Sequence, residues 1–206
     1  MMPATLGVIL AGGLSRRMGG VEKSFLALGD RTLLAHVAER LVSQCESLII
    51  NANGNSSRFD ATGLPVVPDV IPGHEGPLAG ILTALEWTAM HRSQVAWVVS
   101  VPSDTPFIPM DLVRRLHEAR HDAQSLLACA SSDGRPHFAI GLWPVSLRDD
   151  LRQAIVDKGL RSIREWTSFY GCAKAMWPVE TIDPFFNINT PDDLVQAQIL
   201  LSDDRT

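Results

Sequence analysis

Residues 7–23 read GVILAGGLSRRMGGVEK, and this stretch decides both the fold and the kind of site that the sequence predicts. The apolar run at 6–10 is typical of a buried parallel strand. It ends in two glycines, which let backbone N–H groups approach a bound anion without a Cβ in the way. Arg16, Arg17 and Lys23 supply positive charges for phosphate oxygens. A strand that runs into a glycine-rich basic loop, followed by a helix pattern, predicts a nucleotide site in an open α/β sheet.

This loop differs from two well-known phosphate-binding patterns. The dinucleotide fingerprint GxGxxG is absent, and Glu22 stands where the P-loop pattern GxxxxGK[ST] requires a glycine before Lys23. What remains, from residue 10 to residue 23, is LAGG-xxx-RMG-xxx-K. A purely structural turn between a strand and a helix would need neither the basic residues nor the second glycine pair. We therefore interpret the stretch as a phosphate-binding loop of another type.

The composition indicates one globular domain spanning residues 1–206. With 206 residues, of which 46% are hydrophobic and 20% charged, the chain can bury a sizeable core. The formal net charge of −5 argues against a protein that coats nucleic acid or an anionic membrane. The three cysteines form no CxxC pair and are expected to be reduced thiols. No signal segment or apolar run of transmembrane length is evident, so we expect a cytoplasmic protein.

Strand and helix patterns alternate along the rest of the chain. Strands are expected at 6–10, 47–50, 65–67, 95–101, 125–130, 138–143 and 173–177, with a short extended segment at 25–28. Helices are expected at 33–44, 77–90, 110–121, 146–157, 162–168 and from 191 onwards. Thr32 and Thr190 are the predicted N-caps of two of them. The alternation predicts a three-layer α/β fold, in which a mostly parallel twisted sheet carries helices on both faces.

Two polar side chains follow strands of this predicted sheet directly. Asp104 comes just after the most apolar strand, 95–101, and Asn51 begins a polar run just after the strand at 47–50. The carboxyl ends of parallel strands are where this architecture binds ligands. Mg²⁺ prefers oxygen ligands and is often held by only one or two carboxylates together with substrate phosphates, so Asp104 is a candidate metal ligand. The structural alternative is a turn-forming aspartate ahead of Pro106.

The motifs keep one order along nearly the whole chain. After the first loop come Asn51 and Asp69, then GPLAG at 76–80, SDTP at 103–106 and NINTP at 187–191. This set resembles the molybdenum cofactor guanylyltransferases (molybdopterin-guanine dinucleotide synthases), which implies a Rossmann-like nucleotidyltransferase fold. Transferases of several nucleotide specificities share the first loop, whereas its combination with GPLAG and NINTP is more specific.

The resemblance also implies a reaction and the residues of its site. GTP and molybdenum-bearing molybdopterin join, pyrophosphate is released, and the guanine dinucleotide form of the cofactor remains. Lys23, Arg17 and Asp104 are the expected catalytic residues, and Mg²⁺ is expected on Asp104 and Asn187. The residues expected to bind the nucleotide are Leu10, Ala11, Gly12, Gly13, Lys23, Asn51, Asp69, Gly80 and Asp104.

The acceptor side of the site is less well defined by the sequence. The stretch 133–161, where the resemblance places the pterin substrate, matches the family loosely, and Arg135, His137 and Arg161 are candidate contacts there. Each is equally explained as a surface or turn residue. Handover of the product to a molybdoenzyme or its chaperone is implied by the resemblance alone. We expect a monomer.

Several other functions remain open from the residues. A transferase of the same fold that uses CTP differs only in base preference. A GTP-binding module without turnover would ordinarily need the P-loop that this chain lacks. A glycosyltransferase with a similar sheet would be expected to hold its metal with a DxD pair, whereas residues 104–106 offer one aspartate.

One further motif belongs to a different class of enzyme. Residues 117–121 match HExxH, which on a helix can hold zinc and supply the base of a metalloprotease. The predicted helix around it is short and rich in charge, and its apolar positions are those of ordinary packing against a sheet. We therefore expect this match to be accidental.

Overall fold

The structure is a computed structural model that describes residues 2–12, 22–73 and 76–203. Its main feature is a seven-stranded sheet with the order β5-β4-β1-β6-β8-β7-β9. Only β8 runs antiparallel to its neighbours; every other pairing in this sheet is parallel. The strands are β1 (Thr5–Leu10), β4 (Ser47–Asn51), β5 (Val66–Val67), β6 (Trp97–Pro102), β7 (Leu127–Ser132), β8 (Arg135–Pro144) and β9 (Cys172–Trp177).

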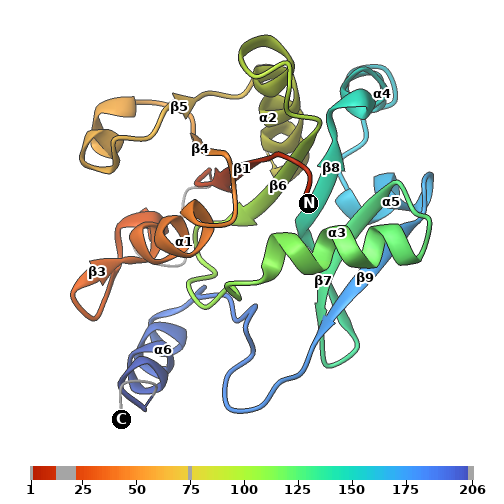
Figure 1. The fold of residues 1–206 in the computed structure, drawn as a ribbon. Coiled ribbons are helices and arrows are strands. Elements are labelled where there is room, and N and C mark those ends of the chain that lie inside the picture. The colour runs from red at the N-terminus through yellow and green to blue at the C-terminus, as the bar shows by residue number, and fades with distance from the viewer. Residues whose placement is uncertain (1, 13–21, 74–75, 204–206) are drawn as a thin grey trace.

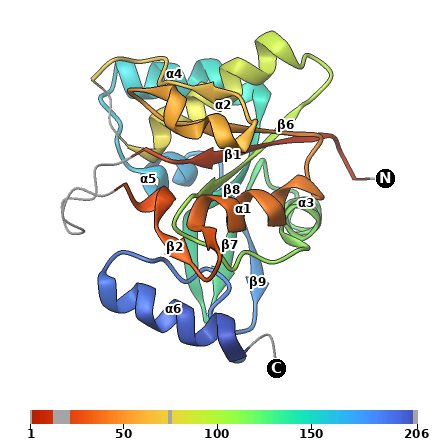
Figure 2. The ribbon, with the colours of Figure 1, turned by 90° about the vertical axis from the view of Figure 1, so that its left-hand side faces the viewer.

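The helices form one layer on each face of the sheet, which confirms the predicted three-layer fold. Figure 2 shows α2 and α4 on one side of β1 and α1 on the other. The main helices are α1 (Leu33–Val42), α2 (Pro77–His91), α3 (Leu112–Asp122), α4 (Arg148–Val156), α5 (Ile163–Ser168) and α6 (Pro191–Asp203). Short 3₁₀ helices are η2 (Lys23–Phe25), η3 (Ser56–Thr62) and η4 (Val145–Leu147), and a small hairpin joins β2 (Ala27–Leu28) to β3 (Arg31–Thr32).

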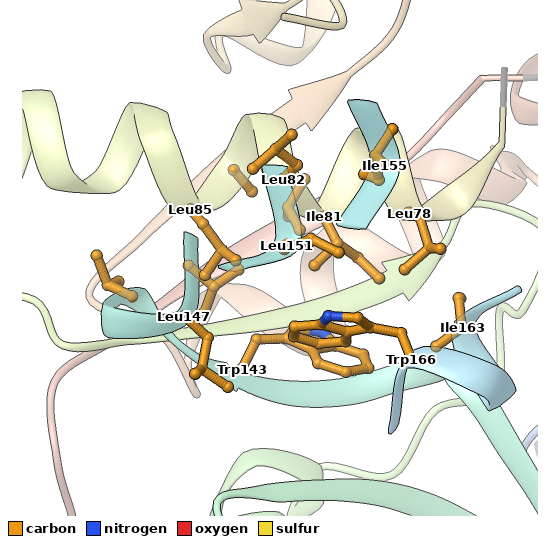
Figure 3. Close-up of a cluster of buried hydrophobic side chains, with 14 of the residues drawn as sticks. Leu78, Ile81, Leu82, Leu85, Trp143, Leu147, Leu151, Ile155, Ile163 and Trp166 are labelled. Carbon is orange, nitrogen blue, oxygen red and sulfur yellow. The ribbon is translucent and has the colours of Figure 1, made fainter. Parts of the chain in front are cut away.

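Two buried apolar clusters hold the layers together, one on each face. The first packs α2, α4 and α5 against the sheet, and in it the rings of Trp143 and Trp166 lie 5.7 Å apart between their centroids (Figure 3). The second packs α1 and α3 against the opposite face, through side chains such as Val37 and Leu116. The continuous apolar runs of β1 and β6 are explained by this arrangement, because both faces of each strand are covered.

The connections between the strands lead to opposite sides of β1, which makes this strand a switch point of the sheet. From β1 the chain returns to the sheet as β4 on one side, whereas β6 lies on the other side of β1. The strand order therefore changes direction at β1, and an open α/β sheet binds its ligands in the crevice outside the carboxyl ends of the strands at such a switch point. Figure 1 shows β1 and β6 side by side at the centre of the molecule.

Most predicted elements are present, and the differences lie at their ends. The strand expected at 95–101 begins at Trp97, because the Val95 amide donates to the Arg92 carbonyl in a turn after α2. The strand expected at 125–130 begins at Leu127, since Gln124 (φ 50°) still terminates α3. The helix expected at 146–157 is split into η4 and α4. The short extended segment expected at 25–28 is present as β2 over its last two residues, whereas its pairing with β3 and the helix η3 were not predicted.

Two predictions about local geometry are confirmed. Thr32 caps α1, since its side chain accepts a hydrogen bond from the Ala35 amide. The β7–β8 connection is a tight turn at Asp133 and Gly134, both with positive φ, which is the conformation that favours an Asp-Gly pair. Along the described residues, no helix is both long and apolar enough to span a membrane.

Candidate active site

The candidate site lies at the carboxyl ends of β1, β4 and β6. Backbone hydrogen bonds join the three strand ends: the Ala11 amide donates to the Asn51 carbonyl at 2.9 Å, and the Ser103 amide donates to the Leu10 carbonyl at 3.1 Å. These bonds extend the parallel ladders by one residue, so the loops that follow start from fixed positions. A fourth segment joins them, because the Ile188 amide donates to the Asp104 carbonyl at 3.0 Å.

Lys23 and Asp104 meet at the centre of this edge. The Lys23 Nζ lies 3.3 Å from the Asp104 Oδ2 and donates to the Asn189 Oδ1 at 2.5 Å. The three residues come from the end of the first loop, the end of β6 and the segment before α6. Their side chains are only partly buried, with 22% of Lys23 and 18% of Asp104 exposed, so a ligand can reach both charges.

The environment of Asp104 disfavours the charged form of its carboxyl group. Burial raises the pKa of the Asp104 carboxyl above its usual value, and the nearby Lys23 ammonium lowers it without cancelling that effect. A carboxylate held in this state gains from a second cation, because the burial penalty falls on the charged form. The adjacent Ser103 hydroxyl is buried and lies 2.9 Å from that of Ser24, which links the β6 loop to η2.

A second group of polar residues lies between β4, β5 and α2. The Asn51 Nδ2 donates to the Asp69 Oδ1 at 2.9 Å, and the Asn53 Nδ2 donates to the Asp69 Oδ2 at 2.8 Å. Gly80 in α2 faces Asn51 so closely that a Cβ added at this glycine would lie 2.3 Å from the Asn51 Oδ1. Any larger residue at this position would displace Asn51, so this packing requires the second glycine of GPLAG, Gly80.

The chain is similar to known nucleotidyltransferases over most of its length. The MobA-like NTP transferase domain matches residues 7–170. A molybdenum cofactor guanylyltransferase of Rhodopseudomonas palustris (strain HaA2) is 52% identical over 95% of this chain and 92% of its own. Another, from Bradyrhizobium sp. (strain ORS 278), is 52% identical over 96% of this chain and 93% of its own. The chain belongs to the molybdenum cofactor guanylyltransferase family.

A solved structure supports the same assignment of fold. The molybdopterin-guanine dinucleotide biosynthesis protein A of Archaeoglobus fulgidus superposes with a TM-score of 0.73 at 25% identity, covering 97% of this chain and 99% of its own. This guanylyltransferase-family chain is therefore a nucleotidyltransferase with the Rossmann-like α/β architecture that the sequence predicted.

The residues predicted for the site are brought together in part. Lys23 and Asp104 are in direct contact, and Asn51, Asp69 and Gly80 form the second polar group. Leu10, Ala11 and Gly12 lie at and after the end of β1, and a Cβ added at Gly12 would meet nothing within 4 Å. Gly13 and Arg17 lie outside the described residues.

Asn187, the predicted second metal ligand, is placed differently from Asp104. Its Oδ1 accepts a hydrogen bond from the buried Thr105 hydroxyl at 2.6 Å, and the residue itself is exposed. One lone pair of the amide oxygen is thus taken by Thr105. Asn189, which the prediction left without a role, makes the contact with Lys23 instead. The sequence signal for it was the NINTP motif itself, whose second asparagine sits next to the helix cap Thr190.

The candidate pterin contacts are not brought together with one another by any hydrogen bond of the described residues. The His137 Nε2 lies 2.7 Å from the Ser132 hydroxyl, and its ring packs 5.0 Å from that of Phe185. Burial lowers the pKa of His137, which favours a neutral ring. Arg135 and Arg161 are exposed.

The HExxH motif forms no metal site within the part of the chain that the structure describes. His117 is buried, with its Nε2 2.9 Å from the Thr5 hydroxyl, whereas His121 is exposed. The described residues hold no cluster of three or more histidine, cysteine or acidic side chains suited to a metal ion. The motif lies at the amino end of the sheet, away from Lys23 and Asp104.

Proposed function

We propose that this enzyme transfers GMP from GTP to the terminal phosphate of molybdenum-bearing molybdopterin and releases pyrophosphate. The observation that carries the proposal is the contact of Lys23 with Asp104 and Asn189 at the switch point of the sheet. It brings one cation and one partly buried carboxylate together at the strand ends, which supports binding of a triphosphate there. The choice of substrates is supported by the names of two relatives, which are molybdenum cofactor guanylyltransferases 52% identical to this chain.

The reaction requires that the two anionic substrates be positioned and their charge compensated, and it does not require a general base. The acceptor phosphate is already anionic near neutral pH; its oxygen bonds to the α-phosphorus of GTP as the bond from that phosphorus to the bridging oxygen breaks, and pyrophosphate leaves. Two polyanions must be held in line for this step. Lys23 would bind oxygens of the departing phosphates and stabilise the charge that moves onto them. Arg17 and the amides of Gly12 and Gly13 are proposed to share this task.

The oxygen donors at Asp104 fit a magnesium ion. The Asp104 carboxylate is accessible, and the amide oxygens of Asn187 and Asn189 lie on the segment that contacts it. All three are hard donors, and one carboxylate suffices for an ion whose remaining ligands are water and substrate phosphates. Asp104 would hold the ion, with Asn187 as a second ligand through the lone pair that Thr105 leaves free. When bound, magnesium neutralises charge on the α-phosphate and the departing pyrophosphate.

The second polar group is proposed to bind the nucleoside. The half-buried Asp69 carboxylate is held by the side chains of Asn51 and Asn53, and Asn51 in turn packs against Gly80. The Val70 amide donates to the Thr83 hydroxyl at 3.1 Å, which fastens this loop to α2. Guanine presents amino and imino donors on one edge, and a fixed carboxylate is a suitable acceptor for them.

The central test is Lys23→Ala compared with Lys174→Ala, a change at an exposed lysine in β9. Turnover of the Lys23 variant should fall by about 10²–10³-fold, the usual cost of removing a group that stabilises transition-state charge. The Lys174 variant should keep wild-type activity, and both should keep the wild-type unfolding temperature within about 3 °C. Normal activity in Lys23→Ala would contradict the assignment.

The nucleotide is identified by thermal unfolding with GTP, CTP or ATP, each with and without Mg²⁺. A ligand at 100 times its dissociation constant stabilises the folded state by about 2.7 kcal/mol, which is readily measured. We expect the largest shift with GTP and Mg²⁺. A preference for CTP would keep the mechanism and overturn the product, and no response to any nucleotide would overturn the proposal. Monomeric state and product handover to a molybdoenzyme or chaperone stay predictions.

A further inference from the structure

Asp193, in the first turn of α6, organises the segment that contacts Lys23. Its Oδ2 accepts hydrogen bonds from the backbone amides of both Asn189 and Thr190, each at 2.8 Å. In return, the Thr190 hydroxyl accepts from the Asp193 amide at 3.2 Å. The reciprocal pair with Thr190 is a helix cap of the usual kind. The bond to the Asn189 amide is additional, because that residue precedes the cap.

The additional bond leads to the reactive centre. Asn189, held through its backbone by Asp193, receives the Lys23 Nζ on its side-chain oxygen at 2.5 Å. Lys23 in turn lies 3.3 Å from the Asp104 carboxylate. A continuous series of polar contacts thus runs from the first turn of α6 to the end of β6, and its longest step, from Asn189 to Lys23, spans 166 residues of sequence.

The charges in this series agree with its geometry. Burial opposes ionisation of Asp193, but the hydrogen bonds from Asn189 and Thr190 outweigh it and lower the pKa of the carboxyl, and the Lys23 ammonium contributes in the same direction. Asp193 is therefore a carboxylate near neutral pH, which makes its bonds to the two amides charge-assisted and stronger than neutral ones.

We propose that Asp193 is a positioning residue for the transfer reaction: it fixes Asn189 so that the Asn189 amide oxygen holds Lys23 in line with the phosphates. The proposal rests on the role given to Lys23 in the proposed function. It goes beyond a helix cap, because a cap alone would stabilise α6 without affecting the place of a lysine 170 residues earlier in the chain. Asp193 itself touches no reacting atom.

The test compares Asp193→Ala with Thr190→Val. The threonine change removes the cap bond to the Asp193 amide and leaves the Asp193 carboxylate on both backbone amides, so it reproduces the loss of the cap alone. Both variants should unfold about 2–4 °C below the wild type. Only Asp193→Ala should lose turnover, by about 10–100-fold in kcat/KM, because small misplacement of a group at the reacting centre has effects of that size. Asp193→Asn, which keeps an acceptor oxygen, should restore most of the activity.

Two further measurements separate positioning from general damage. In a Lys23→Ala background, Asp193→Ala should cause no additional loss of kcat, since the residue acts through the lysine. The second needs no turnover: the chain has three lysines, Lys23, Lys158 and Lys174, so lysine-labelled protein gives three side-chain NMR signals. The Lys23 signal should shift in Asp193→Ala and stay in place in Thr190→Val.

The outcomes distinguish this inference from the proposed function. Equal activity loss in Asp193→Ala and Thr190→Val, additive loss in the Lys23→Ala background, or an unmoved Lys23 signal would each overturn the positioning role. Absence of GMP transfer by the wild-type enzyme would instead overturn the proposed function. In that case the Lys23 signal still shows whether Asp193 determines where the lysine lies.

Discussion

The two ends of the sheet bury polar groups in opposite ways. At the carboxyl end, the Lys23 Nζ and the Asp104 Oδ2 face one another at 3.3 Å, and both side chains remain partly exposed. At the amino end, His117 is 6% exposed, bonds to the Thr5 hydroxyl at 2.9 Å and packs edge-on against the Trp97 ring. Burial, helped by the Arg120 charge, lowers the pKa of His117 to about 4, so its ring is neutral at pH 7. One end leaves its polar groups accessible, and the other encloses its histidine in packing.

This difference shows what separates a site from a motif. Both ends carry residues that match a known catalytic pattern, the glycine-rich basic loop at one and HExxH at the other. At the carboxyl end, loops from three strands converge and their side chains contact each other across large sequence distances. At the amino end, the Nε2 of His117 contacts Thr5 of the neighbouring strand, and among the described residues its buried Nδ1 has no hydrogen-bond partner. Convergence of several loops on accessible charge is the stronger indicator of function.

The largest expected effect is at Asp104. Asp104→Asn keeps the shape of the side chain and removes the carboxylate proposed to hold magnesium, which should lower turnover by about 10³-fold, because metal stabilisation of transition-state charge is worth several kcal/mol. Asp122→Asn, a change at the exposed last residue of α3, is the matched control and should leave turnover unchanged. Steady-state kinetics checks both. If the turnover of Asp104→Asn stays within tenfold of the wild type, the carboxyl end of the sheet is not where the reaction takes place.

The next effect tests whether close packing at the carboxyl end serves the nucleotide. Added Cβ atoms would lie 2.3 Å from the Asn51 Oδ1 in Gly80→Ala and 2.4 Å from the Trp143 ring in Gly141→Ala. Both variants should lose about 1–3 kcal/mol of stability, the usual cost of overpacking. Only Gly80→Ala should also raise the KM for GTP, by about 30-fold, because Asn51 would leave Asp69. Equal KM values in the two variants would show that Asn51 has no part in binding.

A smaller effect is expected at Asp69. Asp69→Asn replaces one carboxylate oxygen by an amino group, which then faces the side-chain amide donors of Asn51 or Asn53. We expect GTP affinity to fall about tenfold, as for the loss of one charged hydrogen bond, with little change in kcat. Asp60→Asn in η3 is the control. Calorimetric titration with GTP and CTP would check this, and an unchanged preference and affinity would move the base pocket elsewhere.

The sequence predicted the parts of this arrangement that depend on neighbouring residues better than the contacts between residues far apart in the chain. The strands β1 and β6 were predicted because they are buried on both faces and read as continuous apolar runs. Asp104 and Asn51 were found because the first lies just beyond β6 and the second ends β4. The β2–β3 hairpin has two residues in each strand, too few for any alternation to be visible.

The contacts within the site were beyond what the sequence pattern could show. Lys23 and Asn189 are far apart in the chain and meet because α6 returns beside β2. Asp193 carried one local signal, since Thr190 followed three residues later by an acidic residue is a capping pattern. That pattern predicts the helix start and says nothing about the additional bond to Asn189. Tertiary structure supplied that information.

The smallest expected effect on turnover is at the amino end, where the readout is the pH dependence of stability. His117 has a pKa of about 4 in the folded protein against about 6.5 when exposed, so between these values the unfolded chain takes up a proton that the folded one does not. Stability is fully present above about pH 6.5 and falls as the pH drops towards 4, by up to about 3 kcal/mol from this residue. His117→Gln should flatten that slope and leave GMP transfer at pH 8 within about twofold of the wild type, because the residue lies far from Lys23.

His121→Gln is the matched control, because it changes the second histidine of the same motif at an exposed position. Its slope should equal that of the wild type, and added zinc should stabilise none of the three proteins. Part of the slope should persist in His117→Gln, since burial also lowers the pKa of His137. An unchanged slope in His117→Gln would mean that the buried histidine is not the group that titrates. Loss of transfer in a variant that stays folded at pH 8 would mean that the two ends of the sheet are coupled, and the contrast between a reactive end and a packed end would then no longer hold.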